Sequence, residues 1–288
     1  ADNTTGTYPL SATQLAPPEP GFNSTDGYGH VNAKRAFENL LNISLTDQPA
    51  LGGNLWGLDN VNAPEVWAGG GGFSGVTGEN TTIAVIDTGV DSNHSEFSGR
   101  MVAGYDFVDN DTTAEDGNGH GTHVAGTIAG ANDGTGITGV AYDADIMPIR
   151  VLNNSGSGSL SDVIAGIRWA ADNNADVINL SLGGGGYSQA MFDAVQHASD
   201  NGSVVVMAAG NSGGSSPGYP AAHAVSYGMA IGAVDRNRAM AGFSNRAGSN
   251  TMDYVTAPGV NIYSAIPGGG YASFNGTSMP APPVAGIA

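Results

Sequence analysis

Short hydrophobic runs alternate with amphipathic stretches along the middle of this chain. Four apolar runs, each bounded by turn residues, predict strands over 83–86, 146–152, 177–180 and 204–207. Between them, hydrophobic residues spaced three and four apart predict helices over 160–167 and 191–198, which Ser159 and Ser188 would cap. Alternating strands and helices predict an α/β fold with three layers: a doubly wound parallel sheet with helices on both faces.

The first fifty residues follow a different pattern. The proline-rich stretch 16–21 predicts an extended, irregular backbone. The next stretch, 31–41, predicts a short amphipathic helix with one hydrophobic face made of Ala33, Phe37, Leu40 and Leu41. We therefore expect residues 1–50 to form an N-terminal extension or packing arm without chemistry, and residues 51–288 to form the main domain.

Composition narrows the possible functions. The chain of 288 residues carries a formal charge of −18 and a single lysine, Lys34, so nucleic-acid binding is not expected, because phosphate contacts need clustered basic residues. No apolar stretch approaches the ~20 residues that a membrane span needs. The absence of cysteine excludes disulfides and thiolate chemistry. No signal peptide stands at the start of the sequence, so any export segment would lie outside it.

Candidate chemistry gathers at the ends of the predicted strands. Asp87 and Asn211 each follow a strand, His120 opens a glycine-flanked helical stretch, and Ser278 lies in a Gly-Thr-Ser turn that we expect to open a helix. Ligands of parallel sheets bind beyond the carboxyl ends of the strands. A carboxylate, an imidazole, a hydroxyl and an amide donor are the groups that nucleophilic acyl transfer needs. Each residue alone is explained as a cap or turn residue. Cap and turn preferences do not explain why all four residues occur in this order.

These residues, in the order Asp, His, Asn and Ser, resemble those of the subtilases, the subtilisin-like serine peptidases. The resemblance covers residues 55–288 and lies closest to the thermitase and subtilisin branch. It implies a serine endopeptidase in which Asp87 orients His120, His120 is the general base and acid, and Ser278 is the nucleophile. Asn211 and the Ser278 N–H would bind the oxyanion, and His123 would be structural. The resemblance further implies secretion and a structural calcium cofactor.

The resemblance also implies a cleft in which a protein or peptide substrate binds as an extended strand between two edges. One edge is formed by Ser181, Leu182 and Gly183, and the other by Gly156, Ser157 and Gly158. The small residues Ala208, Gly210 and Gly218 would leave the pocket for the P1 side chain open, which predicts a large apolar P1 residue. Leu160 would line a second apolar pocket. We expect a monomer without nucleic-acid partners or a membrane span.

Two acidic loops resemble calcium loops of the family, and closely spaced oxygens suit a hard cation. The first loop would contribute Asp106, Asp109, Asp111, Thr113 and Glu115. The second would contribute the Asp133 side chain, the carbonyls of Ala131, Thr135 and Ile137, and the carboxylate of Glu96. A solvated acidic surface is the alternative interpretation of both loops. The second loop also lacks a ligand near Gly52, where the family usually has a side-chain ligand.

Several features depart from the family pattern. Pro280 and Pro283 replace residues of the helix after the serine. Pro280 is tolerable in a first helical turn, whereas we expect Pro283 to remove a donor deeper in the helix, where proline can cost ~3 kcal/mol. The sequence stops at Ala288, so we expect the domain to be truncated at its C-terminus. The stretch 27–33 resembles a segment that often closes the domain at that end, which suggests that residues 27–41 fill part of the missing surface.

These departures leave a second function open, a catalytically impaired peptide-binding or interaction module on the same fold. A third interpretation, nucleotide binding at the glycine run 183–186, lacks both the strand-to-helix glycine fingerprint and a Walker lysine.

Overall fold

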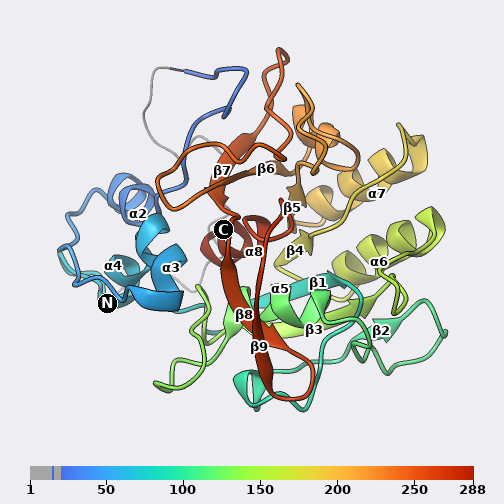
Figure 1. Cartoon of the computed structure of the whole chain (residues 1–288), viewed down its shortest axis with the longest axis horizontal. Coiled ribbons are helices and arrows are strands. Elements are labelled where there is room, and N and C mark those ends of the chain that lie inside the picture. Colours follow the sequence, from blue (N-terminus) through green and yellow to red (C-terminus); the bar gives the residue numbers. More distant parts are fainter. Residues whose placement is uncertain (1–14, 16–20) are drawn as a thin grey trace.

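A parallel sheet forms the centre of the molecule (Figure 1). The computed structural model describes Leu15 and residues 21–288. The sheet has seven strands in the order β2-β3-β1-β4-β5-β6-β7, and each neighbouring pair runs parallel. The strands are β1 (Thr82–Asp87), β2 (Tyr105–Asp106), β3 (Asp145–Arg150), β4 (Val177–Leu180), β5 (Val204–Ala208), β6 (Met229–Val234) and β7 (Tyr254–Pro258). The predicted parallel sheet is confirmed.

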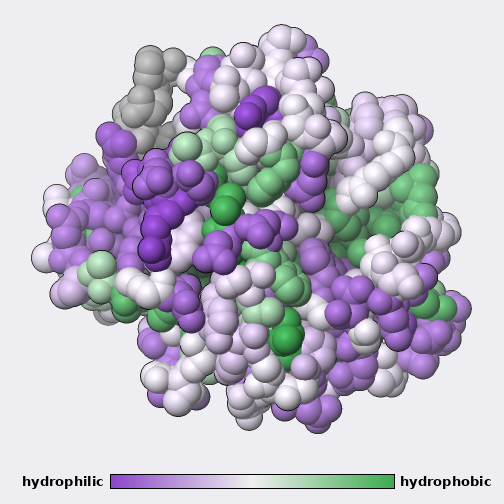
Figure 2. All heavy atoms as spheres, in the orientation of Figure 1, coloured by the Kyte–Doolittle hydropathy of each residue, from purple (hydrophilic) through white to green (hydrophobic). Residues whose placement is uncertain are grey.

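Helices cover both faces of the sheet. One hydrophobic core joins the sheet to α5 (His120–Ala129) and α8 (Ala281–Ile287), and the other joins it to α6 (Leu160–Asp172) and α7 (Gln189–Asp200). Side chains of β1 alternate between the two cores, with Ile83 and Val85 in the first and Ala84 and Ile86 in the second. The predicted three-layer fold is therefore confirmed. Figure 2 shows hydrophobic residues concentrated where α6 and α7 face each other.

The predicted helix caps are confirmed. Ser159 accepts a hydrogen bond from the backbone N–H of Asp162, and Ser188 accepts one from that of Met191. The sequence did not predict β2, β6, β7 or the antiparallel hairpin of β8 (Ile262–Ile266) and β9 (Gly270–Phe274). It also did not predict the helices α3 (Trp56–Val61) and α4 (Ala63–Ala68) or the 3₁₀ turns η1 (Gly53–Leu55), η2 (Ser95–Phe97) and η3 (Ala221–Val225).

The N-terminal arm lies against the edge of the sheet. Backbone N–H groups of Tyr28 and Val31 donate to carbonyls of β7, at Tyr254 and Thr256, and the N–H of Thr256 donates back to Gly29. Helix α2 (Ala33–Leu41) follows, capped by the side chain of Asn32. Ala33 is buried as predicted, whereas Leu41 is exposed, so that part of the predicted hydrophobic face is wrong. Residues 16–20 of the predicted extended stretch lie outside the described residues.

The outer surface of α2 and α3 is largely hydrophilic (Figure 2), in keeping with the acidic composition. Among the described residues, none of the helices combines the length and hydrophobicity needed to cross a bilayer.

Candidate active site

Strand β1 delivers Asp87 to one edge of the sheet, and helix α5 begins there with His120. The Nδ1 atom of His120 lies 2.8 Å from Oδ1 and 2.9 Å from Oδ2 of Asp87. The carboxylate is fully buried, and its Oδ1 also accepts the N–H of Thr88 at 2.7 Å. Because the carboxylate can only accept, Nδ1 carries the proton and Nε2 is left as the basic nitrogen.

The electrostatic setting of His120 favours its protonated form. Burial lowers the pKa of His120, but the charge and hydrogen bond of Asp87, together with the charge of Asp116, outweigh it. The pKa of His120 therefore lies above its ordinary value of 6.5. An imidazole held in this way can take a proton from a nucleophile and keep it through a reaction step.

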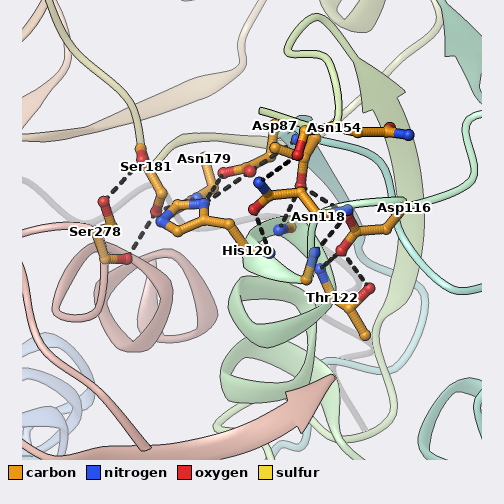
Figure 3. Close-up of polar contacts among 12 residues, drawn as sticks. Asp87, Asp116, Asn118, His120, Thr122, Asn154, Asn179, Ser181 and Ser278 are labelled. Carbon is orange, nitrogen blue, oxygen red and sulfur yellow. Dashed lines mark hydrogen bonds and ion pairs between the residues drawn. The ribbon is translucent and has the colours of Figure 1, made fainter. Parts of the chain in front are cut away.

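Ser278 lies on the other side of the imidazole from Asp87 (Figure 3). Its hydroxyl donates to the carbonyl oxygen of Ser181 at 2.9 Å, and the Ser181 hydroxyl donates to the Ser278 carbonyl at 2.8 Å. Among the described residues, no hydrogen bond joins Ser278 to His120. Ser278 stands in the turn before α8, which begins at Ala281, so the prediction that the serine opens the helix is wrong.

Asn211 follows β5 and faces the same turn. Its Oδ1 accepts the backbone N–H of Thr277 at 2.7 Å and the Thr277 hydroxyl at 2.9 Å, which leaves the Nδ2 group available as a donor. Gly276, at φ +146°, leaves space in front of it. A Cβ atom at Gly276 would lie 3.4 Å from Asn211 Nδ2 and 3.8 Å from the backbone N of Ser278. Both donors therefore border the same small volume.

The predicted cleft residues lie around this edge. Ser181 and Ala208 are buried at strand ends, while 156–158 and Gly218 are exposed, and Leu160 is 50% exposed. The Gly218 N–H donates to the Ala209 carbonyl, and the Gly184 N–H donates to the Tyr219 carbonyl, so the segments around the predicted P1 pocket are tied to one another. Leu182 packs partly against the second core. Gly183 is exposed, and the Gly210 N–H donates to the Thr277 hydroxyl at 3.0 Å.

The first acidic loop binds the positively charged side chain of Arg150. The Nη1 atom of Arg150 lies 2.6 Å from a carboxylate oxygen of Asp106 and 2.6 Å from one of Asp109. Other predicted ligands of this loop are engaged elsewhere. The carboxylate of Asp111 accepts the Thr113 N–H, the carbonyl of Thr113 accepts the Glu115 N–H, and the carboxylate of Glu115 binds Ser92. In this arrangement the guanidinium of Arg150 binds the carboxylates of Asp106 and Asp109, which a calcium ion would need as ligands.

The second loop has a different arrangement. The Glu96 carboxylate accepts the N–H groups of Ala131 and Ile137, at 2.8 and 3.2 Å, and the Tyr271 hydroxyl at 2.7 Å. No hydrogen bond from the described residues reaches the carbonyls of 131, 135 or 137. Asp133 is exposed and binds Thr135, which lowers the pKa of the Asp133 carboxyl. Free carbonyls beside carboxylates suit a calcium ion, although the described residues bring no three carboxylate or histidine side chains together.

His123 lies one turn along α5 from His120. Its Nε2 is 3.0 Å from the Ile262 carbonyl and 3.2 Å from the Ala272 carbonyl, and its ring stacks on Phe274. Burial lowers the pKa of His123 to about 4, so this histidine is neutral at pH 7. These contacts support the structural role that the sequence predicted.

The prolines of α8 stand at its start. The helix begins at Ala281, and Pro280 occupies its N-cap position. Pro282 and Pro283 fall in the first turn, where backbone N–H groups have no intrahelical partner. The expectation that Pro283 removes a donor deep in the helix is therefore wrong.

The sequence analysis missed two polar groups beside the site. Asp116 is buried and accepts five hydrogen bonds around the start of α5, and Thr277 fixes the amide of Asn211. An aspartate before Gly-Asn-Gly is a recognisable capping signal that could have identified Asp116.

Comparison with known proteins shows which family the chain belongs to. The sequence model of the subtilase family matches residues 78–288. The chain belongs to the subtilase family. Thermitase from Thermoactinomyces vulgaris is 45% identical over 243 residues, which are 84% of this chain and 83% of thermitase. Subtilisin Savinase from Lederbergia lenta is 46% identical over 233 residues, 81% of this chain and 82% of that protein.

A solved structure described as a cold adapted subtilisin-like serine proteinase superposes with a TM-score of 0.69 at 43% identity, covering 81% of this chain and 83% of that one. This subtilase is thus a subtilisin-like serine endopeptidase, a hydrolase of peptide bonds.

Proposed function

We propose that Asp87, His120 and Ser278 form the catalytic triad and that Asn211 and the Ser278 N–H bind the oxyanion. The observation that carries this proposal is the contact of His120 Nδ1 with both oxygens of a buried Asp87 carboxylate. That contact directs Nε2 away from Asp87, on the side where Ser278 lies (Figure 3).

The chemistry follows from these positions. Ser278 rotates from Ser181 toward His120, its oxygen attacks the carbonyl carbon of the substrate, and Nε2 takes the hydroxyl proton. The developing oxyanion accepts hydrogen bonds from Asn211 Nδ2 and the Ser278 N–H. His120 then gives its proton to the leaving amine, which breaks the peptide bond and leaves an acyl-enzyme. Water, deprotonated by His120, hydrolyses the ester and restores Ser278.

Labelling with a fluorophosphonate tests the triad. We expect wild-type protein to be labelled at Ser278, and Ser278→Ala and His120→Ala to lose the label. Equal labelling of His120→Ala would contradict the role of the histidine. A wild type that is not labelled and hydrolyses no peptide would favour the impaired binding module, for which the Ser278–Ser181 hydrogen bond is the supporting observation.

We further propose that the substrate lies as an extended strand between 156–158 and 181–183, with P1 in a pocket bordered by Ala208, Gly210 and Gly218 and a second apolar residue against Leu160. Small residues at the pocket leave room for a large apolar P1 side chain. Cleavage-site profiling of a denatured protein tests this preference, and a strong preference for Lys or Arg would contradict it.

Calcium binding is proposed for the second loop alone, because its carbonyls are free while Arg150 occupies the first loop. A bound ion would stabilise the folded state and takes no part in the steps above. Secretion and a monomeric state stay predictions of the sequence.

The assignment of residues 21–50 to a packing arm is supported by the pairing of residues 28–31 with β7. Val31, Ala33 and Ala36 share one hydrophobic core with Val284 and Ile287 of α8. The pairing with β7 and the shared core support the proposal that residues 27–41 cover part of the surface on the side of the sheet where α8 lies.

A further inference from the structure

A buried carboxylate outside the proposed triad joins the two segments that carry Asp87 and His120. Asp116 is 8% exposed. Its Oδ1 accepts the Thr88 hydroxyl at 2.9 Å and the N–H groups of Asn118 and Gly119, each at 2.8 Å. Its Oδ2 accepts the Thr122 N–H at 2.9 Å and the Thr122 hydroxyl at 2.6 Å. Figure 3 shows this network on the side of the His120 ring that faces away from Ser278.

Thr88 is the link to the aspartate of the triad. It follows Asp87 directly, and its backbone N–H donates to Asp87 Oδ1 at 2.7 Å. Its hydroxyl donates to Asp116 and accepts the Gly121 N–H at 2.9 Å. The Asp116 carboxylate therefore binds both the residue after Asp87, at the end of β1, and the first turn of α5, which begins with His120.

We propose that Asp116 is a positioning residue, which sets the distance and orientation between Asp87 and His120 by holding Thr88 and the first turn of α5. The proposal rests on the proposed triad. Asp116 touches neither the reacting atoms nor the predicted cleft, so its loss should lower kcat and leave KM almost unchanged. An error of about 1 Å in such a pair can cost roughly 10²-fold in rate.

Asp116 also acts through its charge. The charged or titratable groups facing His120 are Asp87 from β1, Asp116 from the loop before α5, and His123 on α5 itself, which is neutral at pH 7. A negative charge near the imidazole favours the imidazolium form, so removing it should move the acidic limb of kcat/KM to lower pH. Loss of a purely structural capping group would lower stability and leave that limb in place.

The test compares three variants with the wild type. Asp116→Asn keeps the shape and removes the charge, and we expect kcat to fall roughly 10- to 100-fold and the acidic limb to move to lower pH. Thr88→Val removes the hydroxyl that binds Asp116 but keeps the charge of Asp116. We therefore expect kcat to fall while the acidic limb of kcat/KM stays at the same pH. Asp176→Asn is the matched control, because Asp176 accepts the Thr82 N–H at 2.8 Å at the other end of β1. It should lower Tm at most.

An NMR titration of His120 in a Ser278→Ala background gives a readout that needs no activity. We expect the pKa of His120 to fall in Asp116→Asn and to stay constant in Asp176→Asn. Wild-type kcat in Thr88→Val, or an unmoved His120 titration in Asp116→Asn, would overturn the proposal. If the wild type neither hydrolyses peptides nor labels at Ser278, the proposed triad fails, and the NMR titration alone decides the role of Asp116.

Discussion

The Ser278 hydroxyl donates to the carbonyl of Ser181, and the Ser181 hydroxyl donates to the carbonyl of Ser278, at 2.9 and 2.8 Å. This reciprocal pair joins the end of β4 to the turn before α8. It also gives the hydroxyl of the proposed nucleophile an alternative partner to His120, from which it must rotate before reaction.

The first prediction concerns Ser181→Ala. It removes the hydrogen bond to Ser278 and leaves the buried amide of Asn179 without its Ser181 partner. An unpaired buried polar group costs about 1–3 kcal/mol, which urea unfolding would measure. Ser203→Ala, which deletes a buried hydroxyl bonded to the Ala175 carbonyl, is the matched control. We expect kcat to fall only in Ser181→Ala; equal kcat in both variants would contradict a role in placing Ser278.

The second prediction concerns the oxyanion donor. Asn211→Ala should lower kcat about 10²–10³-fold with little change in KM, a magnitude measured on a subtilisin rather than calculated from this structure. Thr277→Val, which keeps Asn211 but removes one of its two partners, should cost less. Steady-state kinetics of both variants on a peptide substrate test this prediction. If Asn211→Ala changed KM more than kcat, Asn211 would bind the ground state of the substrate instead.

The third prediction concerns pH. The base must be neutral to accept a proton, and the pKa of His120 is raised above 6.5 by Asp87 and Asp116. The acidic limb of kcat/KM should therefore lie above pH 6.5. The same raised pKa contributes stability below the unfolded value near 6.5, which is lost as pH rises through the folded value. A limb at or below pH 6 would show that burial outweighs the two carboxylates.

The fourth prediction concerns α8. Because Pro283 stands in the first turn, Pro283→Ala should change the free energy of unfolding by no more than about 1 kcal/mol. Ala285→Pro, two residues further along the helix and beyond its first turn, should cost about 3 kcal/mol or more. Thermal melts of both variants measure the contrast. A strong gain in stability from Pro283→Ala would mean that the proline strains the helix.

The fifth prediction concerns calcium. If the second loop binds the ion, a chelator removes stabilisation of about 2.7 kcal/mol at a hundredfold excess over Kd, so Tm should fall by several degrees. Asp133→Ala should reduce this sensitivity to chelator, and Asp111→Ala, in the loop that holds Arg150, should not. A melt unchanged by EGTA would contradict the site and leave Glu96 as a hydrogen-bond acceptor for the loop.

Much of the fold could be predicted because the buried strands and amphipathic helices carry local patterns. The strands β1, β4 and β5 are continuous apolar runs, and Ser159 and Ser188 mark helix starts. Strand β2 has only two residues, and β8 and β9 are partly exposed and contain serine, tyrosine or glycine, so these three strands lack the continuous apolar run of the central strands.

The candidate site was only partly predictable for a similar reason. Asp87 and Asn211 could be expected to meet because both follow strands of one parallel sheet, and the resemblance to the subtilases adds His120 and Ser278 to them. The Ser278 hydroxyl binds Ser181 rather than His120 because of its side-chain rotamer. Arg150 binds the first acidic loop because the register of β2 and β3 places it beside Asp106. Neither is encoded in a motif.

The arm that pairs with β7 has a consequence for how the chain acquires its shape. The hydroxyl of Thr256 reaches the carbonyl of Gly29 across 227 positions of sequence. During synthesis the early segment must therefore stay unpaired until residue 256 has been added, and closing a contact over so many residues is slow. Removing it would uncover a row of free N–H and C=O groups on β7, an open template for another chain. Self-association through this exposed edge strand would then compete with folding.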